Sequence, residues 1–349
     1  MKLDSLTPRC WSPLPLYCGF TVSGADAAQF LQGQLTNDVI ALTTTRSQRS
    51  GYCTPKGRLM ATFLQWRITE DTIGHILPSS LLERTTKRLK MFVLRSKAAF
   101  SGPESALAVF GLWLDDLSSS GIGAAIGDVT PVTGLEEGQA WLIREPNSAL
   151  GARVWLIADP AAMGKIESHL QTFADRAVPE EAWLCAEIQS GKPWVWPQTV
   201  EAFVPQMINF ELVDGVSFKK GCYPGQEVVA RSQYLGKLKR RTFHVSMQSP
   251  DHALISQFGG RSTEGGHPLA LLIGAEVWSP SDTTQPVGQV VDAARATTSA
   301  SGATENKIHL LIEVTLEAWS GGGLRLGSLA ALSPSLSQES LPYSLTSPE

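Results

Sequence analysis

The spacing of apolar residues changes near residue 240, and this change limits the possible folds more than any other feature of the chain. Before it, stretches with helical spacing alternate with strand-like runs, whereas after it short apolar runs are separated by turn-rich spacers. The first pattern is typical of α+β structure and the second of a β-barrel. We therefore predict an α+β region over 1–240, a C-terminal β-barrel over 241–330 and a polar tail over 331–349.

Local signals indicate where single elements lie. Capping residues and apolar faces predict helices that begin near Ser23, Ser80, Pro160 and Pro179, with Phe92 on the buried stripe of the second. The apolar runs expected to form strands are 62–68, 72–77, 140–144, 153–158, 243–247, 269–278, 287–291 and 308–316.

Charge and hydropathy exclude several classes of protein. The 349 residues carry 29 basic and 33 acidic side chains, so no overall positive field favours nucleic acid or an anionic membrane, and any basic site must be local. The most apolar stretch, 269–275, is far shorter than the ~20 residues that span a bilayer. The N-terminal residues lack the apolar core of a signal peptide. We therefore expect a cytoplasmic protein with no membrane partner.

The cysteines and histidines show no metal-binding spacing. The five cysteines are scattered without a CxxC pair, and the six histidines form no HxxxH or HExxH motif. We therefore expect thiols rather than disulfides, and no metal site.

Cys222 lies in the segment with the most unusual composition. Two glycines and a proline surround it, so the backbone can turn sharply and present the thiol at a tip. Lys219 and Lys220 precede it, and positive charge favours a thiolate, which is the reactive form. Cys222 is therefore a candidate reactive thiol with Lys220 as its partner. The alternative is a buried structural cysteine beside a tight turn.

The same segment is strongly basic. Residues 219–241 contain seven basic side chains and one acid, Glu227, whereas the whole chain has a net charge of -4. Such a stripe could hold a polyanion, such as the carboxylates of a folate tail or an RNA backbone, although a charge run also serves simply as a solvated face.

Residues 220–227, with the sequence KGCYPGQE, resemble the KGCYxGQE signature of the YgfZ family, which comprises folate-binding relatives of the glycine-cleavage T-protein and of mitochondrial iron–sulfur assembly factors. The resemblance extends over nearly the whole chain. The other matching positions are 23–39, 56–58, Phe203, Pro205, Gln206, Asn209, Arg231, Tyr234, Gly236, Arg240 and 341–345.

This resemblance implies a fold and a function. The fold is a T-protein-like folate-binding body with a ferredoxin-like portion, joined to a C-terminal β-barrel. The function is that of a folate-binding accessory protein that supports iron–sulfur cluster assembly or repair and thereby tRNA modification. The cofactor would be tetrahydrofolate or a derivative, and the partners would be iron–sulfur proteins or tRNA-modifying enzymes, with a weak tRNA contact through 219–241 as a further possibility.

The resemblance also implies roles for single residues. The folate-contacting aromatics of the family fall at Tyr17 and Trp183, whose flat faces could stack on the ring systems of folate. Gln189 falls at the position of the acid that contacts the pterin, and Tyr223 and Arg231 of the signature region are further candidates for folate binding. Cys222 could act as a nucleophile, a redox thiol or a transient cluster ligand.

Two departures weaken the alternative of a folate-dependent aminomethyltransferase or demethylase. Ala61 and Thr62 stand where the T-protein acids would lie, and neither side chain can take the place of a carboxylate in proton transfer or in stabilising a developing cation. Gln189 offers one acceptor oxygen where a carboxylate offers two. Glu187 lies two residues away and points elsewhere on a helix, so we do not expect it to replace that acid.

Overall fold

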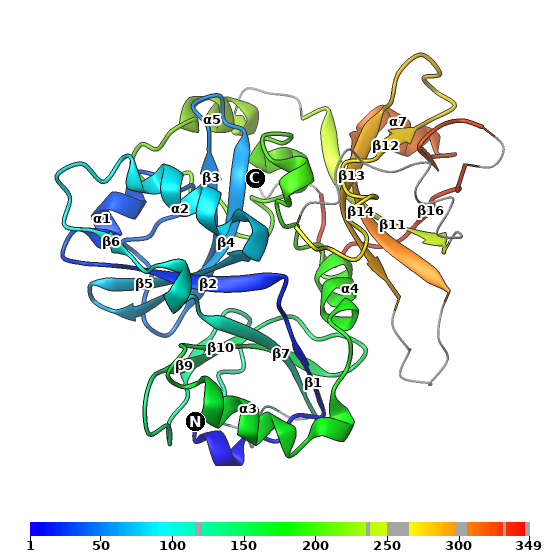
Figure 1. The fold of residues 1–349 in the computed structure, drawn as a ribbon. Coiled ribbons are helices and arrows are strands. Elements are labelled where there is room, and N and C mark those ends of the chain that lie inside the picture. Colours follow the sequence, from blue (N-terminus) through cyan, green and yellow to red (C-terminus); the bar gives the residue numbers. More distant parts are fainter. Residues whose placement is uncertain are drawn as a thin grey trace.

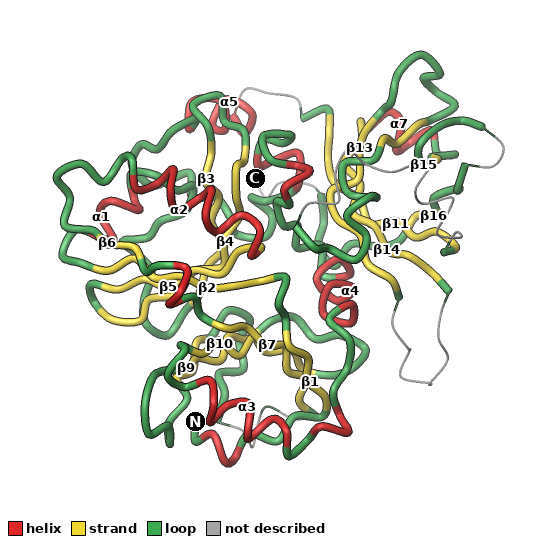
Figure 2. Tube along the Cα trace, in the orientation of Figure 1, coloured by secondary structure: helices red, strands yellow, loops and turns green. Residues whose placement is uncertain are grey.

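Three antiparallel sheets form the protein (Figure 1; Figure 2). The computed structural model describes residues 1–115, 117, 121–234, 238–249, 265–296, 306–330 and 333–345. Helices and short 3-10 turns cover the sheets, and helix α4 (Glu181–Gln189) packs against strands β13 (Gly288–Arg295) and β14 (Lys307–Thr315) of the C-terminal sheet. The fold class is α+β with a C-terminal barrel, as predicted.

The first sheet has the strand order β3-β4-β5-β2-β6. The expected hairpin is present, because β4 pairs with β5 around a polar turn at Glu70 and Asp71. This sheet carries the opening helix and a basic helix, α2. Its elements are β2 (Tyr17–Ser23), α1 (Ala27–Gln32), β3 (Ser47–Cys53), β4 (Leu59–Thr69), β5 (Thr72–Pro78), α2 (Leu82–Lys90) and β6 (Ala99–Phe100).

The second sheet has the order β1-β7-β10-β9-β8, with one face covered by helix α3. Ile166 and Leu170 of this helix are fully buried in the same apolar cluster as Leu112 and Leu156 of the sheet, which is the burial that helical spacing of the apolar residues predicts. The elements are β1 (Cys10–Pro13), β7 (Ala108–Leu114), β8 (Val129–Pro131), β9 (Ala140–Arg144), β10 (Ala152–Ala158) and α3 (Met163–Gln171).

The third sheet, with the order β15-β12-β13-β14-β11-β16, curls around its own apolar core. Its two ends are joined, because Arg325 of β15 bridges to Ser335 and Leu336 donates its N–H to Leu324 just before the chain enters β16. This closure makes the sheet barrel-like. The elements are β11 (Arg240–Gln248), β12 (Glu276–Trp278), β13 (Gly288–Arg295), β14 (Lys307–Thr315), α7 (Leu316–Gly321), β15 (Arg325–Leu326) and β16 (Ser337–Gln338).

Two local predictions were wrong. The run 269–278 is a strand only over Glu276–Trp278, because i to i+3 backbone hydrogen bonds such as Leu272 N–H to Leu269 O fold its first part into buried turns. Phe92 lies beyond the end of α2 and is 44% exposed rather than buried. The helices near Ser23, Ser80, Pro160 and Pro179 are present, and each begins a few residues later than expected. The division of the chain at residue 240 stays a prediction.

Candidate functional site

The KGCYPGQE segment is a loop that leads into helix α5 (Gln226–Tyr234), with Gly221 and Cys222 exposed and Lys220 and Tyr223 buried. Cys222 lies on this loop as an exposed free cysteine. The expected exposure of the thiol is confirmed, with the turn itself at Pro224 and Gly225, and the alternative of a buried structural cysteine is wrong.

Lys220 anchors this loop to the opening helix. Its ammonium is buried and donates hydrogen bonds to the carbonyl oxygens of Gln32, the last residue of α1, and of Leu35, both at 2.5 Å. It also lies 5.1 Å from the ring centroid of Tyr223. Burial lowers the pKa of Lys220 to about 8, although Asp38 opposes the shift. Lys220 therefore satisfies carbonyls at a helix end, and its effect on the Cys222 thiol stays a prediction.

A pair of glycines fixes the other end of the loop. Gly225 and Gly57 have φ values of +82° and +69°, a backbone conformation that favours glycine. A Cβ atom on Gly225 would lie 2.4 Å from the Thr54 carbonyl oxygen and 2.6 Å from the Gly57 Cα atom. The signature loop is therefore packed directly against the turn at 56–58, the two segments that the family resemblance had singled out separately.

Other residues that carried the resemblance join the same assembly. The Gln206 side chain donates to the Val229 carbonyl of α5, at 2.8 Å. Asn209 donates to the Thr242 carbonyl at 2.7 Å, and Tyr343 from the C-terminal segment donates to the Gly191 carbonyl at 2.7 Å. These contacts tie the signature region, the barrel and the end of α4 together.

The basic stripe over 219–241 is interrupted, in contrast to our expectation. Lys220 is buried, Arg240 pairs with Glu313, and Arg241 pairs with the buried Glu211. Lys219, Arg231 and Lys239 are exposed, and Lys237 lies outside the described residues. Three of the seven cations are therefore committed to internal contacts, because buried charges require partners.

Tyr17 and Trp183 lie far inside the molecule, in a buried junction where the three sheets meet. Tyr17 packs 5.1 Å from Trp194 and 5.3 Å from Trp155, and Trp155 packs 4.4 Å from Trp183, as measured between ring centroids. Trp183 is fully buried against the Gly111 backbone and the Arg153 guanidinium. The buried junction consists of Tyr17, Arg49, Glu145, Arg153, Trp155, Trp183, Glu187, Lys192, Trp194, Trp196, His267 and Asp292.

Buried charges neutralise one another in this junction. Glu187 accepts a hydrogen bond from Arg49 at 2.9 Å and from the Trp194 indole at 3.0 Å, and Arg153 lies 3.0 Å from its other oxygen. Glu145 pairs with Lys192 and Arg49. Burial alone raises the pKa of Glu145, but the cations Lys192, Arg49 and Arg153 lower it to about 2. The Glu145 carboxylate therefore stays ionised in the interior.

Several hydrogen-bond donors in the junction lack partners. Among the described residues, the Tyr17 hydroxyl, the Trp183 indole N–H and the Arg49 Nε and Nη1 atoms are buried and make no hydrogen bond. Buried polar groups are nearly always paired in native proteins. Unpaired donors at flat aromatic walls can bind a planar ligand with acceptor atoms at its edge.

A β-bulge brings one acid into the junction from the barrel. The register of β13 shifts between Val290 and Asp292, and Asp292 lies fully buried beside His267, at 3.6 Å. Burial raises the pKa of Asp292 to about 7, whereas burial lowers the pKa of His267 to about 3. Near neutral pH this histidine is uncharged and leaves the carboxyl group without a counter-ion.

Gln189 and Glu187 differ in burial, and the pterin contact expected at Gln189 stays a prediction. Gln189 is exposed at the end of α4, whereas Glu187 faces inward and holds two arginines. The inward face of α4 carries Trp183 and Glu187 one turn apart, since residues four apart share a helix face. Sequence spacing could have identified Glu187 from Trp183, but nothing in the sequence indicated Arg49 or Asp292.

Comparisons with known proteins bear on this arrangement. No family model matches the chain. The protein named tRNA-modifying protein YgfZ from Colwellia psychrerythraea is 31% identical over 259 residues, which are 72% of this chain and 77% of that protein. Its namesake from Edwardsiella ictaluri is 31% identical over 70% of this chain and 69% of that protein, and an uncharacterized protein of Haemophilus influenzae is 32% identical over 67% and 72%. The chain belongs to the YgfZ family.

The fold of this YgfZ family member has a solved relative. The glycine cleavage system aminomethyltransferase T from Bartonella henselae superposes with a TM-score of 0.57 over 97% of this chain and 88% of that one, at 14% sequence identity. At that identity the likeness shows the shared fold alone.

The strand that follows the turn at 56–58 lacks acids in this YgfZ family member. Ala61 is fully buried on β4 opposite Tyr52, and the Thr62 hydroxyl accepts a hydrogen bond from the Val195 N–H at 3.0 Å. Both positions therefore serve packing and backbone pairing.

In the described ranges, no helix is long and apolar enough to cross a bilayer. No group of three or more metal-ligating side chains occurs in the same ranges. His244 and His309 contact each other across β11 and β14, with 2.9 Å between Nε2 and Nδ1, although the sequence presents them as isolated.

Proposed function

We propose that this protein is a folate-binding accessory factor that supports iron–sulfur cluster assembly or repair and, through it, tRNA modification. The observation that carries the proposal is the exposed Cys222, presented by a loop that Lys220 and Gly225 anchor at both ends. Relatives that share this family are named tRNA-modifying proteins, which supports a role in the same process.

An exposed thiol on a fixed loop suits contact with a partner protein. Iron–sulfur clusters are usually held by four thiolates, so Cys222 alone cannot hold one. A cluster bound through Cys222 would need ligands from an iron–sulfur partner, and a redox or nucleophilic role would also require the exposure that Cys222 has.

The buried junction fits tetrahydrofolate by the chemistry of its donors. Tyr17, Arg49 and Trp183 have unpaired donors that can meet the acceptor atoms at the edge of a pterin ring, and Glu187 can accept from its N–H groups. Stacking on Trp183 requires its covered faces to open, since Gly111 and Arg153 pack against the ring. When bound, tetrahydrofolate would supply a carrier for one-carbon units. Tyr223 and Arg231 belong to the signature region and stay candidates for contact with its tail.

The alternative is a folate-dependent aminomethyltransferase, since the solved relative with this fold has that activity in its name. Ala61 and Thr62 offer no carboxylate for such a transfer. We therefore favour the accessory function. An assay with aminomethyl donors and tetrahydrofolate decides between them, because turnover would support the transferase and folate binding without turnover would support the accessory factor.

The function itself is tested in cells that lack the gene. Nucleosides from their tRNA should lack a modification made by an iron–sulfur enzyme, and a plasmid copy of the gene should restore it. An unchanged nucleoside profile would contradict the proposal.

A further inference from the structure

Helix α2 and the turn that follows it form an exposed basic surface, which we call the basic prong and define as residues 84–97. It contains six basic residues and no acidic ones, on a chain whose net charge is -4. Five of the six side chains are exposed: Arg84, Lys87, Lys90, Arg95 and Lys97.

Large apolar side chains are exposed among these cations. Met91, Phe92 and Leu94 are 60%, 44% and 89% exposed. Leu94 has a φ of +46°, which costs a leucine conformational energy, and the turn is held by the Lys97 N–H donating to Asp26 at 2.7 Å. A fixed turn that displays apolar residues at this cost marks an interaction surface.

Structural roles account for only some of the positively charged side chains of the prong. Cations in the last turn of α2 stabilise its negative C-terminal end, which accounts for Lys87 and Lys90. Arg95 and Lys97 lie beyond the helix, where this effect has decayed. Among the described residues, Arg84 is the only prong cation within 4.0 Å of a carboxylate, that of Glu201. The charge is therefore available to an anionic partner.

We propose that the basic prong is the surface on which RNA docks, an inference that rests on the proposed role in tRNA modification. Arg84, Lys87 and Lys90 are spaced three residues apart, so they form a line along one helix face with a rise of ~4.5 Å per step, and such a line can follow a phosphate backbone. The exposed Phe92 ring offers a stacking face for an unpaired base. The turn also encloses an open concavity of about 610 Å³, lined by residues 92–96.

The chemistry favours RNA over a lipid surface. An interfacial membrane helix places its own apolar face into the lipid, but of the two apolar residues of α2, Leu89 is buried in the core and Leu82 is half-buried against it. The residues of the helix that face the solvent are the cations Arg84, Lys87 and Lys90 and one acid, Glu83, which precedes the prong.

The prong lies next to the signature loop through a short series of contacts. Arg84 approaches Glu201, and the neighbouring Ala202 accepts a hydrogen bond from Arg58 in the turn that Gly225 packs against. RNA held on the prong would therefore extend toward the side of the molecule that displays Cys222.

The test measures binding of unfractionated tRNA by the full chain as a function of salt. Each phosphate contact contributes ~0.7–0.9 to the slope of log affinity against log salt, so Lys90→Gln with Arg95→Gln should lower the slope by ~1.4–1.8 and weaken binding ~25- to 60-fold near 0.1 M salt. Phe92→Ala should weaken binding ~5- to 160-fold without changing the slope, and Phe92→Tyr should bind like the parent.

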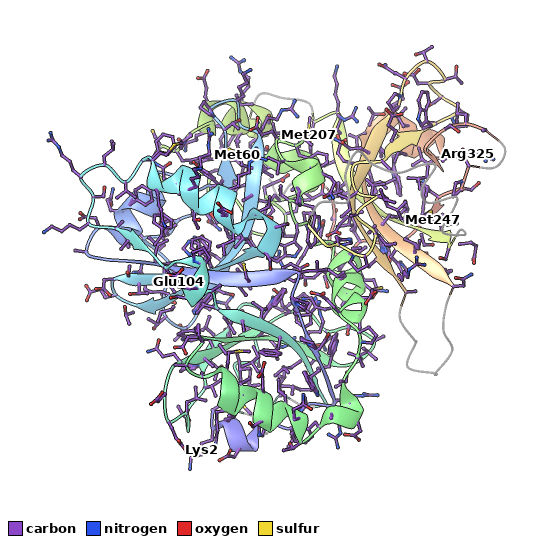
Figure 3. All side chains as sticks on the ribbon, viewed as in Figure 1. Lys2, Met60, Glu104, Met207, Met247 and Arg325 are labelled. Carbon is purple, nitrogen blue, oxygen red and sulfur yellow. The ribbon has the colours of Figure 1, made fainter. Side chains whose placement is uncertain are left out.

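The matched control is Lys2→Gln with Lys165→Gln, which removes the same charge from exposed positions on the other side of the molecule, where Lys2 is labelled (Figure 3). This pair should bind tRNA like the parent protein. The inference would be overturned if the control pair lost as much tRNA affinity as the prong pair, or if the prong variants bound tRNA like the parent protein. It would also be overturned if the prong variants lost binding to anionic vesicles but kept binding to tRNA. If the prong variants bind tRNA normally while deletion of the gene still removes the tRNA modification, the docking of RNA on the prong is refuted and the proposed function is not.

Discussion

Removing the hydroxyl of Tyr17 tests whether the buried junction is built for a ligand. Tyr17 is 2% exposed, and its ring is held by Trp155, Trp194 and Trp196. Burial raises the pKa of Tyr17 well above 10, with Asp292 next in effect, so the hydroxyl is neutral. It has no hydrogen-bond partner among the described residues. Tyr17→Phe therefore removes one unpaired polar atom and leaves the ring packing unchanged.

The magnitude follows from the cost of an unpaired buried group. Such a group costs ~1–3 kcal/mol, so Tyr17→Phe should leave the free energy of unfolding unchanged or raise it by up to ~3 kcal/mol. If the hydroxyl donates to bound folate, the loss of that hydrogen bond, worth ~0.5–1.5 kcal/mol, should weaken tetrahydrofolate binding ~2- to 10-fold.

Two measurements test these expectations for Tyr17→Phe. Urea unfolding without ligand gives the stability difference, and calorimetric titration with tetrahydrofolate gives the affinity difference. Tyr234→Phe is the control, because Tyr234 is 68% exposed and should change neither quantity. A stability loss of more than ~1 kcal/mol for Tyr17→Phe would show that the hydroxyl has a structural partner, and unchanged folate affinity would remove Tyr17 from the binding site.

Three further substitutions test the site. Lys220→Met leaves two buried carbonyls unpaired and should lower stability by ~1–3 kcal/mol in urea unfolding, whereas a Cys222 alkylation profile moved to higher pH at unchanged stability would favour the thiol-tuning role instead. Asp292 has its folded pKa raised to about 7, so its protonated form adds stability that is full below pH ~4 and is lost as the pH rises through 7. Asp292→Asn should abolish this pH-dependent fall in the free energy of unfolding, which amounts to up to ~4 kcal/mol. Equal pH profiles of stability for the variant and the parent protein would refute the expectation. Gly225→Ala should lower the melting temperature because its Cβ meets the backbone of Gly57, and a parental melting temperature would contradict that packing.

The sequence predicted the features that depend on local pattern. The hairpin of β4 and β5, the barrel strands β11, β13 and β14 and the helices α1 to α4 follow from residue spacing, and the exposure of Cys222 agrees with the glycines and the proline beside it. These features depend on residues close together along the chain.

The sequence could not show contacts that form only after the sheets pack. Glu187 is separated by 138 positions from Arg49, and Asp292 enters the junction only because of a bulge in β13. The sequence also could not show that the Lys220 ammonium points toward helix α1, since the carbonyl groups that accept its hydrogen bonds lie more than 180 positions earlier. Long-range pairs of this kind leave no periodic signal.

The most direct test of the account replaces one atom, the sulfur of Cys222. Cys222→Ser should change the free energy of unfolding by no more than ~0.5 kcal/mol, because the side chain is exposed. In cells that lack the gene, this variant should fail to restore the modified tRNA nucleosides, whereas Cys18→Ser, a change at a half-buried thiol outside the loop, should restore them. Full restoration by Cys222→Ser, measured by mass spectrometry of digested tRNA, would contradict the central role of the exposed thiol.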